Sequence, residues 1–258
     1  MSGRLDGKVA IVTGGGSGVG RSAALLFAQE GARVVAAGRT LSKVEETARL
    51  VSDAGGECLA VRCDVADSTD VQALIDAAME RFGALHVIVN NAGVGYSAEP
   101  ELSMQDVVGT PEADWQTVMD ITLTSVFLTS KYGIPRIIES GGGSIVNVSS
   151  IGGVQGMFDA HTYSAAKAGM VNLTRSMAIR YGSQGLRVNC VAPGGIDTEM
   201  IASRIAQRAD APAPTGPVRG LGRIAQPEEI AWPIVWLASE EASFVTGAIL
   251  NVDGGASA

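Results

Sequence analysis

The stretch "KVAIVTGGGSGVGR" (residues 8–21) decides the fold class of this chain. Its first seven residues are a short apolar run with β-branched side chains, which is typical of a strand buried on both faces. A turn with Gly14, Gly18 and Gly20 follows, and a helical pattern leads on from it. These glycines do not have the G-x-G-x-x-G spacing, but they meet the same needs of a tight turn and a close backbone approach to a pyrophosphate. Because hairpins and linkers also use glycine, this interpretation depends on the rest of the chain.

The same alternation of strand and helix continues to the end of the sequence. Strands are predicted over 8–14, 33–38, 58–65, 85–91, 143–150, 186–194 and 248–254. Helices are predicted over 18–30, 41–54, 68–82, 115–139, 162–182 and 227–239. Such alternation implies right-handed crossovers, so we expect an α/β fold with a doubly wound, Rossmann-like parallel sheet and helices on both faces. No linker or repeat interrupts it, and residues 1–258 are predicted to form a single domain.

Composition and charge exclude several classes of protein. The 258 residues, 46% of them hydrophobic, suffice for one substantial core, and the net charge of −8 gives no reason to expect nucleic-acid or anionic-membrane binding. No apolar run approaches the ~20 residues of a membrane span, and the N-terminus has no signal-peptide core. Cys58, Cys63 and Cys190 match no metal or redox spacing, so we expect reduced, buried thiols. A soluble cytoplasmic protein is expected.

Small and polar residues gather where the predicted strands end. "NNAG" (90–93) ends the fourth strand, "SS" (149–150) the fifth and "PGGIDT" (193–198) the sixth. Tyr163 and Lys167 follow four residues apart on one helix face, where the cation favours phenolate and lowers a tyrosine pKa from its usual value of about 10. Each group alone has an ordinary explanation as a turn, a strand end or a helix face. Because the carboxyl ends of parallel strands share one edge, we expect these groups to meet there.

In this order and spacing, the motifs resemble those of the short-chain dehydrogenase/reductase family, in its single-domain branch of about 250 residues. The similarity covers nearly the whole chain, from "TGGGSGVG" through "NNAG", "SS", "YSAAK" and "PGGIDT" to "GRIAQPEEIA" (222–231) and "VTGAILNVDGG" (245–255). It implies an oxidoreductase that interconverts a secondary alcohol and a ketone or other carbonyl with a nicotinamide cofactor. Hydride would pass directly between substrate carbon and nicotinamide, so no metal site is expected.

The resemblance also implies roles for individual residues. Tyr163 would be the general acid/base, and Lys167 would lower its pKa and hold the nicotinamide ribose. Ser150, thirteen residues before Tyr163, would bind the substrate oxygen, whereas Ser149 stands at a separation of fourteen. The residues implied to contact the cofactor are Gly14, Ser17, Gly18, Val19, Gly20, Asp64, Val65, Asn90, Asn91, Ala92, Gly93, Tyr163, Lys167, Pro193, Gly194, Ile196 and Thr198.

The second predicted strand ends with a departure that bears on the cofactor. Relatives that prefer NAD usually have an acidic residue where Gly38 stands, and here Arg39 follows this glycine instead. A guanidinium is well suited to pair with a 2′-phosphate, so NADP(H) is predicted, with NAD(H) as the alternative. The ordinary explanation of Arg39 is a solvated residue that opens a helix.

A second departure is Thr122, which stands where the family commonly has asparagine. That asparagine bends its helix and helps to hold a water molecule in the proton relay behind the lysine. Because threonine is shorter and donates only one hydrogen bond, slower proton exchange is predicted rather than inactivity.

Two segments are predicted to shape the substrate pocket. Residues 94–114 are about seven longer than is usual in the family, although a tolerated surface insertion explains them equally well. In the segment 199–222, Met200, Ile201 and Ile205 suit either a hydrophobic substrate or a helix packed on the core. His161, two residues before Tyr163, is interpreted as a rim residue rather than a catalyst.

Two alternatives remain open at this point. One is a dinucleotide-binding regulator with impaired catalysis, which Thr122 favours and the intact Ser150, Tyr163 and Lys167 oppose. The other is a relative that reduces C=C bonds or dehydrates its substrate. Relatives commonly form tetramers through the two long helices, so a homo-oligomer (a tetramer or a dimer) is predicted, although the same apolar residues would also suit the core of a monomer.

Overall fold

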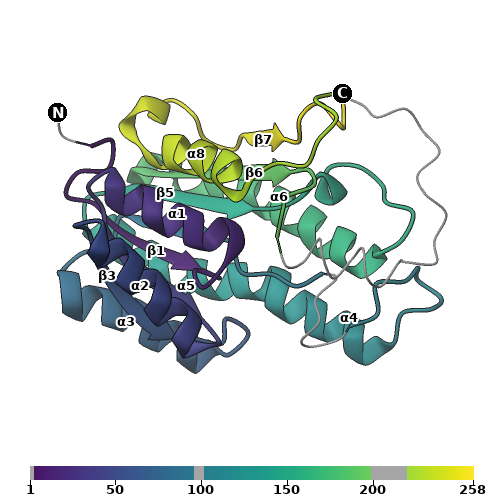
Figure 1. Cartoon of the computed structure of the whole chain (residues 1–258), viewed down its shortest axis with the longest axis horizontal. Helices are drawn as coiled ribbons and strands as arrows, with labels where there is room; N and C mark the ends of the chain where they lie inside the picture. The colour runs from purple at the N-terminus through teal and green to yellow at the C-terminus, as the bar shows by residue number, and fades with distance from the viewer. Residues whose placement is uncertain (1–2, 96–101, 199–219) are drawn as a thin grey trace.

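The computed structural model describes residues 3–95, 102–198 and 220–258, and in this part of the chain seven parallel strands form one sheet (Figure 1). The strands are β1 (Val9–Thr13), β2 (Arg33–Gly38), β3 (Glu57–Arg62), β4 (Val87–Asn90), β5 (Gly143–Val148), β6 (Leu186–Pro193) and β7 (Ile249–Val252). The helices are α1 (Gly18–Gln29), α2 (Leu41–Asp53), α3 (Ser68–Phe82), α4 (Glu112–Met119), α5 (Ser125–Glu139), α6 (His161–Tyr181) and α8 (Pro227–Ala238). The spatial order of the strands is β3-β2-β1-β4-β5-β6-β7, which confirms the doubly wound α/β sheet.

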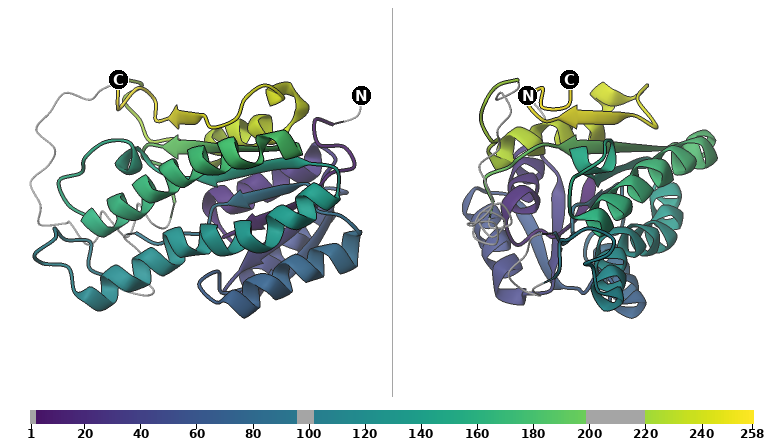
Figure 2. Two further views of the ribbon diagram at one scale, coloured as in Figure 1. Left: turned by 180° about the vertical axis from the view of Figure 1, so that it is seen from behind. Right: turned by 90° about the vertical axis from the view of Figure 1, so that its right-hand side faces the viewer.

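Helices cover both faces of this sheet, as the alternation of buried side chains in β1 requires. Val9 and Ile11 belong to one core cluster, together with residues of α3, α5 and α6. Ala10 and Val12 belong to the other, together with residues of α1 and α8. Figures 1 and 2 show these helices on opposite sides of the strands. Because successive strand side chains point to opposite faces, both must be apolar, which explains the continuous hydrophobic runs in the sequence.

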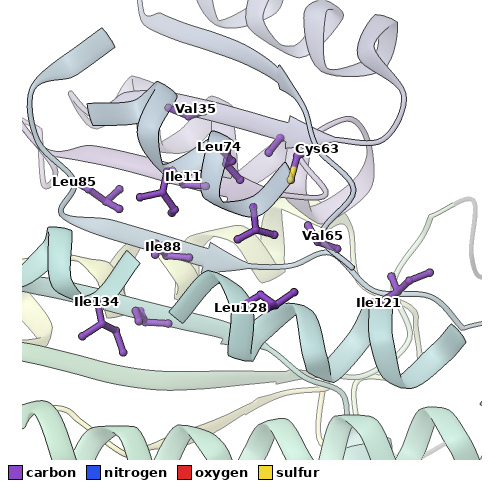
Figure 3. Packing of buried hydrophobic residues seen from close by; sticks show 14 of the residues in the cluster. Ile11, Val35, Cys63, Val65, Leu74, Leu85, Ile88, Ile121, Leu128 and Ile134 are labelled. Atoms are coloured by element: carbon purple, nitrogen blue, oxygen red, sulfur yellow. The ribbon is translucent and has the colours of Figure 1, made fainter. Parts of the chain in front are cut away.

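The first of these clusters joins the centre of the sheet to the helices that lead toward the site. Figure 3 shows Ile11 of β1 and Ile88 of β4 among the side chains of Leu74 and Leu128. Ile121 extends the same cluster toward the carboxyl ends of the strands. Ile11, Leu74 and Ile88 are fully buried. Their burial, worth roughly 2 kcal/mol for each large apolar side chain, fixes the positions of the strand ends on which the site is built.

The order of the strands places a topological switch point beside β1, where open α/β sheets typically have a ligand-binding crevice. Strand β1 pairs with β2 on one side and with β4 on the other, so the chain winds first toward β3 and then away toward β7. At this point the crossovers on the two sides diverge, and ligands of open α/β sheets bind outside the carboxyl ends of the strands there. The motifs at the ends of β1 and β4 lie at this switch point.

The long helix predicted over 115–139 begins earlier and contains a local change of winding. Helix α4 passes into a π-helical turn (Asp120–Thr124) and then into α5, with helical backbone angles at both junctions. Such π turns insert a residue into the helical ladder and occur frequently at functional sites. Thr122, the residue that departs from the family pattern, lies in the middle of this turn.

The other predicted elements are confirmed to within a few residues. The largest difference is at the end of the third strand, which is predicted to reach residue 65. Strand β3 ends at Arg62, because its partner β2 ends opposite it at Gly38. Of the predicted substrate segments, 96–101 and 199–219 lie outside the described residues, and Met200, Ile201 and Ile205 lie outside with them. No helix within the described ranges is both long enough and apolar enough to cross a lipid bilayer.

Candidate active site

Hydrogen bonds tie the ends of β1 and β4 together at the switch point. The hydroxyl of Thr13 accepts from the backbone N–H groups of Asn91 and Ala92, both at 3.1 Å, and it donates to the carbonyl of Val89 at 3.3 Å. The Asn91 amide donates in turn to the carbonyl of Thr13 at 3.1 Å. The "NNAG" segment is therefore held against the glycine turn, as the sequence predicts.

The glycine turn fits so closely that side chains are excluded from it. Gly14 has a φ of +66°, and a Cβ at that position would lie 2.8 Å from the Asn91 amide nitrogen. A Cβ on Gly20 would lie 2.1 Å from the carbonyl oxygen of Gly14. A Cβ on Gly18 would lie 3.2 Å from Cγ2 of Thr198, so the "PGGIDT" segment after β6 also reaches this turn. Three strand ends thus converge on one bare stretch of backbone.

This cradle fits the pyrophosphate of a dinucleotide. Helix α1 begins at Gly18, and its N-cap residue Ser17 is exposed and makes no capping hydrogen bond through its side chain. The first N–H groups of a helix lack partners within the helix, and together with the helix dipole they favour an anion. A glycine backbone without side chains and a helix N-terminus without a side-chain cap are the features that a pyrophosphate requires.

Lys167 is buried next to the Tyr163 ring. Its side chain is 4% exposed, its ammonium donates to the carbonyl of Val148 at 2.7 Å, and the nitrogen lies 5.6 Å from the centre of the Tyr163 ring. Burial lowers the pKa of Lys167 from 10.5 to about 8, since desolvation disfavours the charged form. The two residues of the "YSAAK" motif are therefore close together on α6, while Val148 joins the lysine to the end of β5.

The two serines after β5 have different environments. Ser149 is buried, and its hydroxyl donates to the carbonyl of Lys167 at 2.9 Å. Ser150 is only half-buried, and its hydroxyl oxygen accepts from the N–H of Gly152 at 3.1 Å. The hydroxyl of Ser149 is thus used inside the protein, whereas the hydrogen of the Ser150 hydroxyl remains available for a bound molecule.

Thr122 and Lys167 both lie close to Gly93. A Cβ on Gly93 would lie 3.3 Å from the Lys167 nitrogen and 3.8 Å from the Thr122 hydroxyl oxygen. Thr122 is completely buried, and its hydroxyl accepts a long hydrogen bond of 3.4 Å from the N–H of Val94. The structure therefore brings Thr122 and Lys167 close to the same glycine.

Not every predicted cofactor residue presents its side chain to the crevice. Asn90 is buried, its amide donates to Asn147 at 2.9 Å, and its amide oxygen accepts from Thr129 at 2.7 Å. Val65 is 4% exposed and belongs to a core cluster, while one carboxylate oxygen of Asp64 accepts from the N–H of Ala66 at 3.0 Å. Any contact that Asn90 or Val65 makes with a cofactor would come from its backbone.

Arg39 is exposed at the end of β2 and makes no ion pair within the described residues. A Cβ on Gly38 would lie 3.1 Å from Val44, so the glycine leaves little room on its α2 side. Arg62 stands opposite Gly38 on β3, but its guanidinium pairs with Asp70 at 3.4 Å. Arg39 is thus the cation at this strand end that has no carboxylate partner in the described part of the chain.

The long segment before α4 is tied to the start of α6. The N–H groups of Ala160 and His161 donate to the carbonyls of Met104 and Gln105 at 3.1 and 3.3 Å. Nδ1 of His161 accepts from the N–H of Val107 at 3.1 Å. A cavity of about 290 Å³ lies here, lined by Val107, Thr110, Glu112, Trp115, His161 and Thr162. His161 therefore binds the loop and lines this cavity.

Sequence analysis missed several residues that hold the site in place. The Ser164 hydroxyl donates to the carbonyl of Gly152, whose N–H donates to Ser150, so the helix that carries Tyr163 also braces this serine. Arg21 and Thr47 bind the glycine turn in a similar way. The position of Ser164 next to Tyr163 is the only signal that the sequence offers. Thr47 offers none, because it is far from the turn in sequence.

Known proteins resemble this chain along nearly its whole length. A family model described as "Enoyl-(Acyl carrier protein) reductase" matches residues 14–257. The cis-4-hydroxycyclohexanecarboxylate dehydrogenase of Sinomonas cyclohexanicum is 46% identical over 96% of both chains. The cyclohexanol dehydrogenase of Acinetobacter sp. (strain SE19) is 38% identical over 98% of this chain and 96% of its own.

A solved structure extends the similarity to three dimensions. The carveol dehydrogenase of Mycobacterium avium, in complex with NAD, superposes with a TM-score of 0.90 at 34% identity, over 98% of this chain and 99% of its own. Both the sequence and the fold are thus shared with dehydrogenases along nearly the full length. The chain therefore belongs to the short-chain dehydrogenase/reductase family and is an NAD(P)-dependent oxidoreductase that acts on CH–OH groups.

Proposed function

We propose that this enzyme interconverts an alicyclic secondary alcohol and its ketone with NADP(H), and that Tyr163 transfers the proton. The observation that carries the proposal is the buried Lys167 ammonium, 5.6 Å from the centre of the Tyr163 ring and bonded to Val148. The ring substrate is supported by the relatives, whose names describe hydroxyl groups on six-membered carbocycles.

In the direction of oxidation, Tyr163 as phenolate accepts the proton of the substrate hydroxyl. Ser150 donates a hydrogen bond to the substrate oxygen and so stabilises the charge that develops there. When bound, the nicotinamide supplies or accepts the hydride. In the direction of reduction, the Tyr163 hydroxyl returns its proton to the oxygen.

Lys167 maintains the positive charge that this proton transfer needs. With a pKa of about 8, its ammonium stays mostly protonated at neutral pH, and burial keeps water from screening its field. A cation in a site of low dielectric favours phenolate over phenol, so the phenol can release its proton more easily. Val148 accepts the hydrogen bond of Lys167, and Ser150 follows it two residues later. The end of β5 therefore positions both the Lys167 ammonium and the Ser150 hydroxyl.

The preference for NADP(H) is supported by Arg39 and Gly38. Gly38 supplies no carboxylate to bind a ribose 2′-hydroxyl, and the exposed guanidinium of Arg39 has no ion pair in the described part of the chain. An arginine pairs with a phosphate through two parallel hydrogen bonds, which adds both charge and geometry. NAD(H) is the alternative.

Residues 102–114 of the longer substrate segment would line the pocket around the ring. Support comes from the hydrogen bonds of residues 104–107 to Ala160 and His161, because these bonds join the segment to the start of the helix that carries Tyr163. Exposed apolar side chains on the long helices, Phe127 at 52% and Ile179 at 87%, support the homo-oligomer. Light scattering measures its size.

A product analysis tests the reaction. The purified enzyme is assayed with cyclohexanol and cis-4-hydroxycyclohexanecarboxylate, each with NADP⁺ and with NAD⁺, and with cyclohex-2-enone and NADPH. We expect ketone from the alcohols, allylic alcohol from the enone, and higher kcat/KM with NADP⁺. Saturated ketone from the enone would instead indicate C=C reduction, the reaction named in the description of the family model. NADPH binding without turnover across this panel would indicate a regulator, and an about tenfold preference for NAD⁺ would refute the cofactor assignment.

A further inference from the structure

Two side chains from different helices hold consecutive carbonyls of the glycine turn. The Arg21 guanidinium of α1 donates to the carbonyl of Gly16 at 2.6 Å. The Thr47 hydroxyl of α2 donates to the carbonyl of Gly15 at 2.8 Å. Arg21 also donates to the Thr47 hydroxyl oxygen at 3.1 Å, so the two side chains form one connected unit.

This unit is firmly anchored. Thr47 is completely buried, and the Arg21 side chain is 26% exposed. The same guanidinium pairs with Glu46 at 3.1 Å and donates to the carbonyl of Lys43 at 3.4 Å. The N–H of Gly15 donates to the carbonyl of Ala37 at 3.0 Å. The peptide groups on both sides of Gly15 are therefore fixed, although three consecutive glycines would otherwise be free to rotate.

Fixing the carbonyls also fixes the N–H groups. In a planar trans peptide the C=O of one residue points opposite to the N–H of the next. The N–H of Gly16 therefore points away from Thr47, and the N–H of Ser17 points away from Arg21. Neither donates to a protein acceptor within the described residues. Both stand next to the open N-terminus of α1, where an anion is favoured.

We propose that Arg21 and Thr47 are positioning residues that clamp the turn so that the N–H groups of Gly16 and Ser17 face the phosphate-bearing part of the dinucleotide. The clamp acts through the backbone and lowers the conformational cost of binding, because the donors are oriented before the cofactor arrives. It goes beyond the proposed reaction and does not depend on which dinucleotide is preferred.

Four single variants and the double variant Arg21→Lys/Thr47→Val of the whole protein test the clamp. Thr47→Val keeps the shape and removes the hydroxyl, Thr47→Ser keeps the hydroxyl, and Arg21→Lys keeps the charge but removes the planar fork. Arg49→Lys is the matched control, since Arg49 lies on the same helix α2 and pairs with Asp53 at 2.7 Å on the surface. Dissociation constants of NADPH and NADH are measured by calorimetry without substrate, beside the melting temperature without ligand, KM for the cofactor, and kcat.

We expect Thr47→Val and Arg21→Lys each to raise both dissociation constants about tenfold, the effect of losing about one well-oriented hydrogen bond to a charged group. The KM for the cofactor should rise with them, while kcat at saturating cofactor stays within about twofold, because the reacting atoms are remote from the clamp. Thr47→Ser and Arg49→Lys should bind NADPH and NADH with the dissociation constants of the parent. The double variant should bind little worse than the weaker single variant, because both residues hold one loop.

The contrary results are equally specific. A lower melting temperature with unchanged dissociation constants, measured well below unfolding, would make the clamp a purely structural feature. Additive losses in the double variant, or loss of affinity in Thr47→Ser as large as in Thr47→Val, would show that the hydroxyl does not act through the shared loop. If Thr47→Val does not fold, Arg21→Lys and Thr47→Ser decide between these outcomes.

Discussion

The two ends of the proposed cofactor crevice are built in opposite ways. At the Lys167 end the cation is buried, its pKa is lowered, and Val148 and Gly93 surround it. At the Arg39 end the cation is exposed and has no ion pair in the described part of the chain. A charge that is to shift the pKa of a neighbour must be fixed and shielded from water, whereas a charge that is to pair with an incoming phosphate must be accessible. Changes at the first end should therefore alter the chemistry and, at the buried lysine, also the stability, whereas changes at the second end should alter only the choice of cofactor.

The largest effect is expected from Tyr163→Phe, which removes the proposed acid at the buried end. We expect kcat to fall by about 10³-fold, since general acid/base catalysis typically contributes 10² to 10⁴. NADPH affinity and melting temperature should stay close to those of the parent. Tyr132→Phe is the control, because it removes a hydroxyl that contacts Ser68 at 2.7 Å elsewhere on the protein. Steady-state kinetics measure both, and turnover retained in Tyr163→Phe would assign the proton transfer to another group.

Lys167→Met should lower turnover by about 10²-fold and change how stability depends on pH. The folded pKa of about 8 lies below 10.5, so between these values the unfolded chain binds a proton that the folded chain lacks. The stability of the parent therefore rises with pH through this window, and below pH 8 it carries the full cost of the buried charge. Methionine does not titrate, so Lys167→Met lacks this pH dependence. The free energy of unfolding of the variant minus that of the parent should therefore decrease by about 3 kcal/mol from pH 8 to pH 10.5.

Chemical denaturation at a series of pH values measures this difference. Lys131→Met is the control, because it removes an exposed lysine of α5 instead of the buried lysine of α6. Parallel stability curves for Lys167→Met and the parent would contradict a lowered lysine pKa.

Arg39→Ala should affect only the exposed end of the crevice. We expect KM for NADP⁺ to rise by about 30-fold, in line with roughly 2 kcal/mol for a hydrogen-bonded charge pair, while KM for NAD⁺ and the melting temperature barely change. Arg62→Ala is the control, since this guanidinium lies opposite Gly38 but pairs with Asp70. A loss for NADP⁺ in Arg62→Ala but not in Arg39→Ala would move the phosphate contact to the neighbouring strand.

The smallest effect is expected at Thr122, which lies close to Gly93 as Lys167 does. Thr122→Asn restores the family residue in the π-helical turn, and we expect turnover to rise by up to about fivefold with an altered pH profile, because a longer amide offers more hydrogen bonds to a relay water. Thr124→Asn, in the same turn but bonded to Asp120 at 3.3 Å, is the matched control. Unchanged turnover and pH profile in Thr122→Asn would make this residue purely structural.

Local patterns in the sequence predict most of the elements and the convergence of the motifs. The apolar run of β1 and the glycine turn after it are contiguous, so strand, turn and helix follow from neighbouring residues. Tyr163 and Lys167 share a helix face because four residues make about one turn. That the strand ends meet follows from the parallel order itself.

Contacts between distant residues could not be predicted in the same way. A buried row of hydrogen bonds joins two strands and two helices through Thr129, Asn90, Asn147 and Thr174. It holds the side chain of Asn90, which was predicted to contact the cofactor, in the core. Thr47 reaches Gly15 across 32 residues, and no local signal marks it. Ser149 and Ser150 are adjacent and identical in type, but only the Ser149 hydroxyl donates to the carbonyl of Lys167, whereas the Ser150 hydroxyl accepts from Gly152.

The sequence by itself determined the α/β class, the meeting of the strand-end motifs at one edge of the sheet and the shared helix face of Tyr163 and Lys167, because these depend on local periodicity and on strand ends. Only the tertiary structure decided which polar groups are buried, since burial depends on the elements that pack against each residue. It lowers the pKa of Lys167, places Thr122 in a π turn, and turns the carbonyls of Gly15 and Gly16 toward Thr47 and Arg21. Hydrogen bonds and desolvation act through space, so the order of residues along the chain does not reveal them.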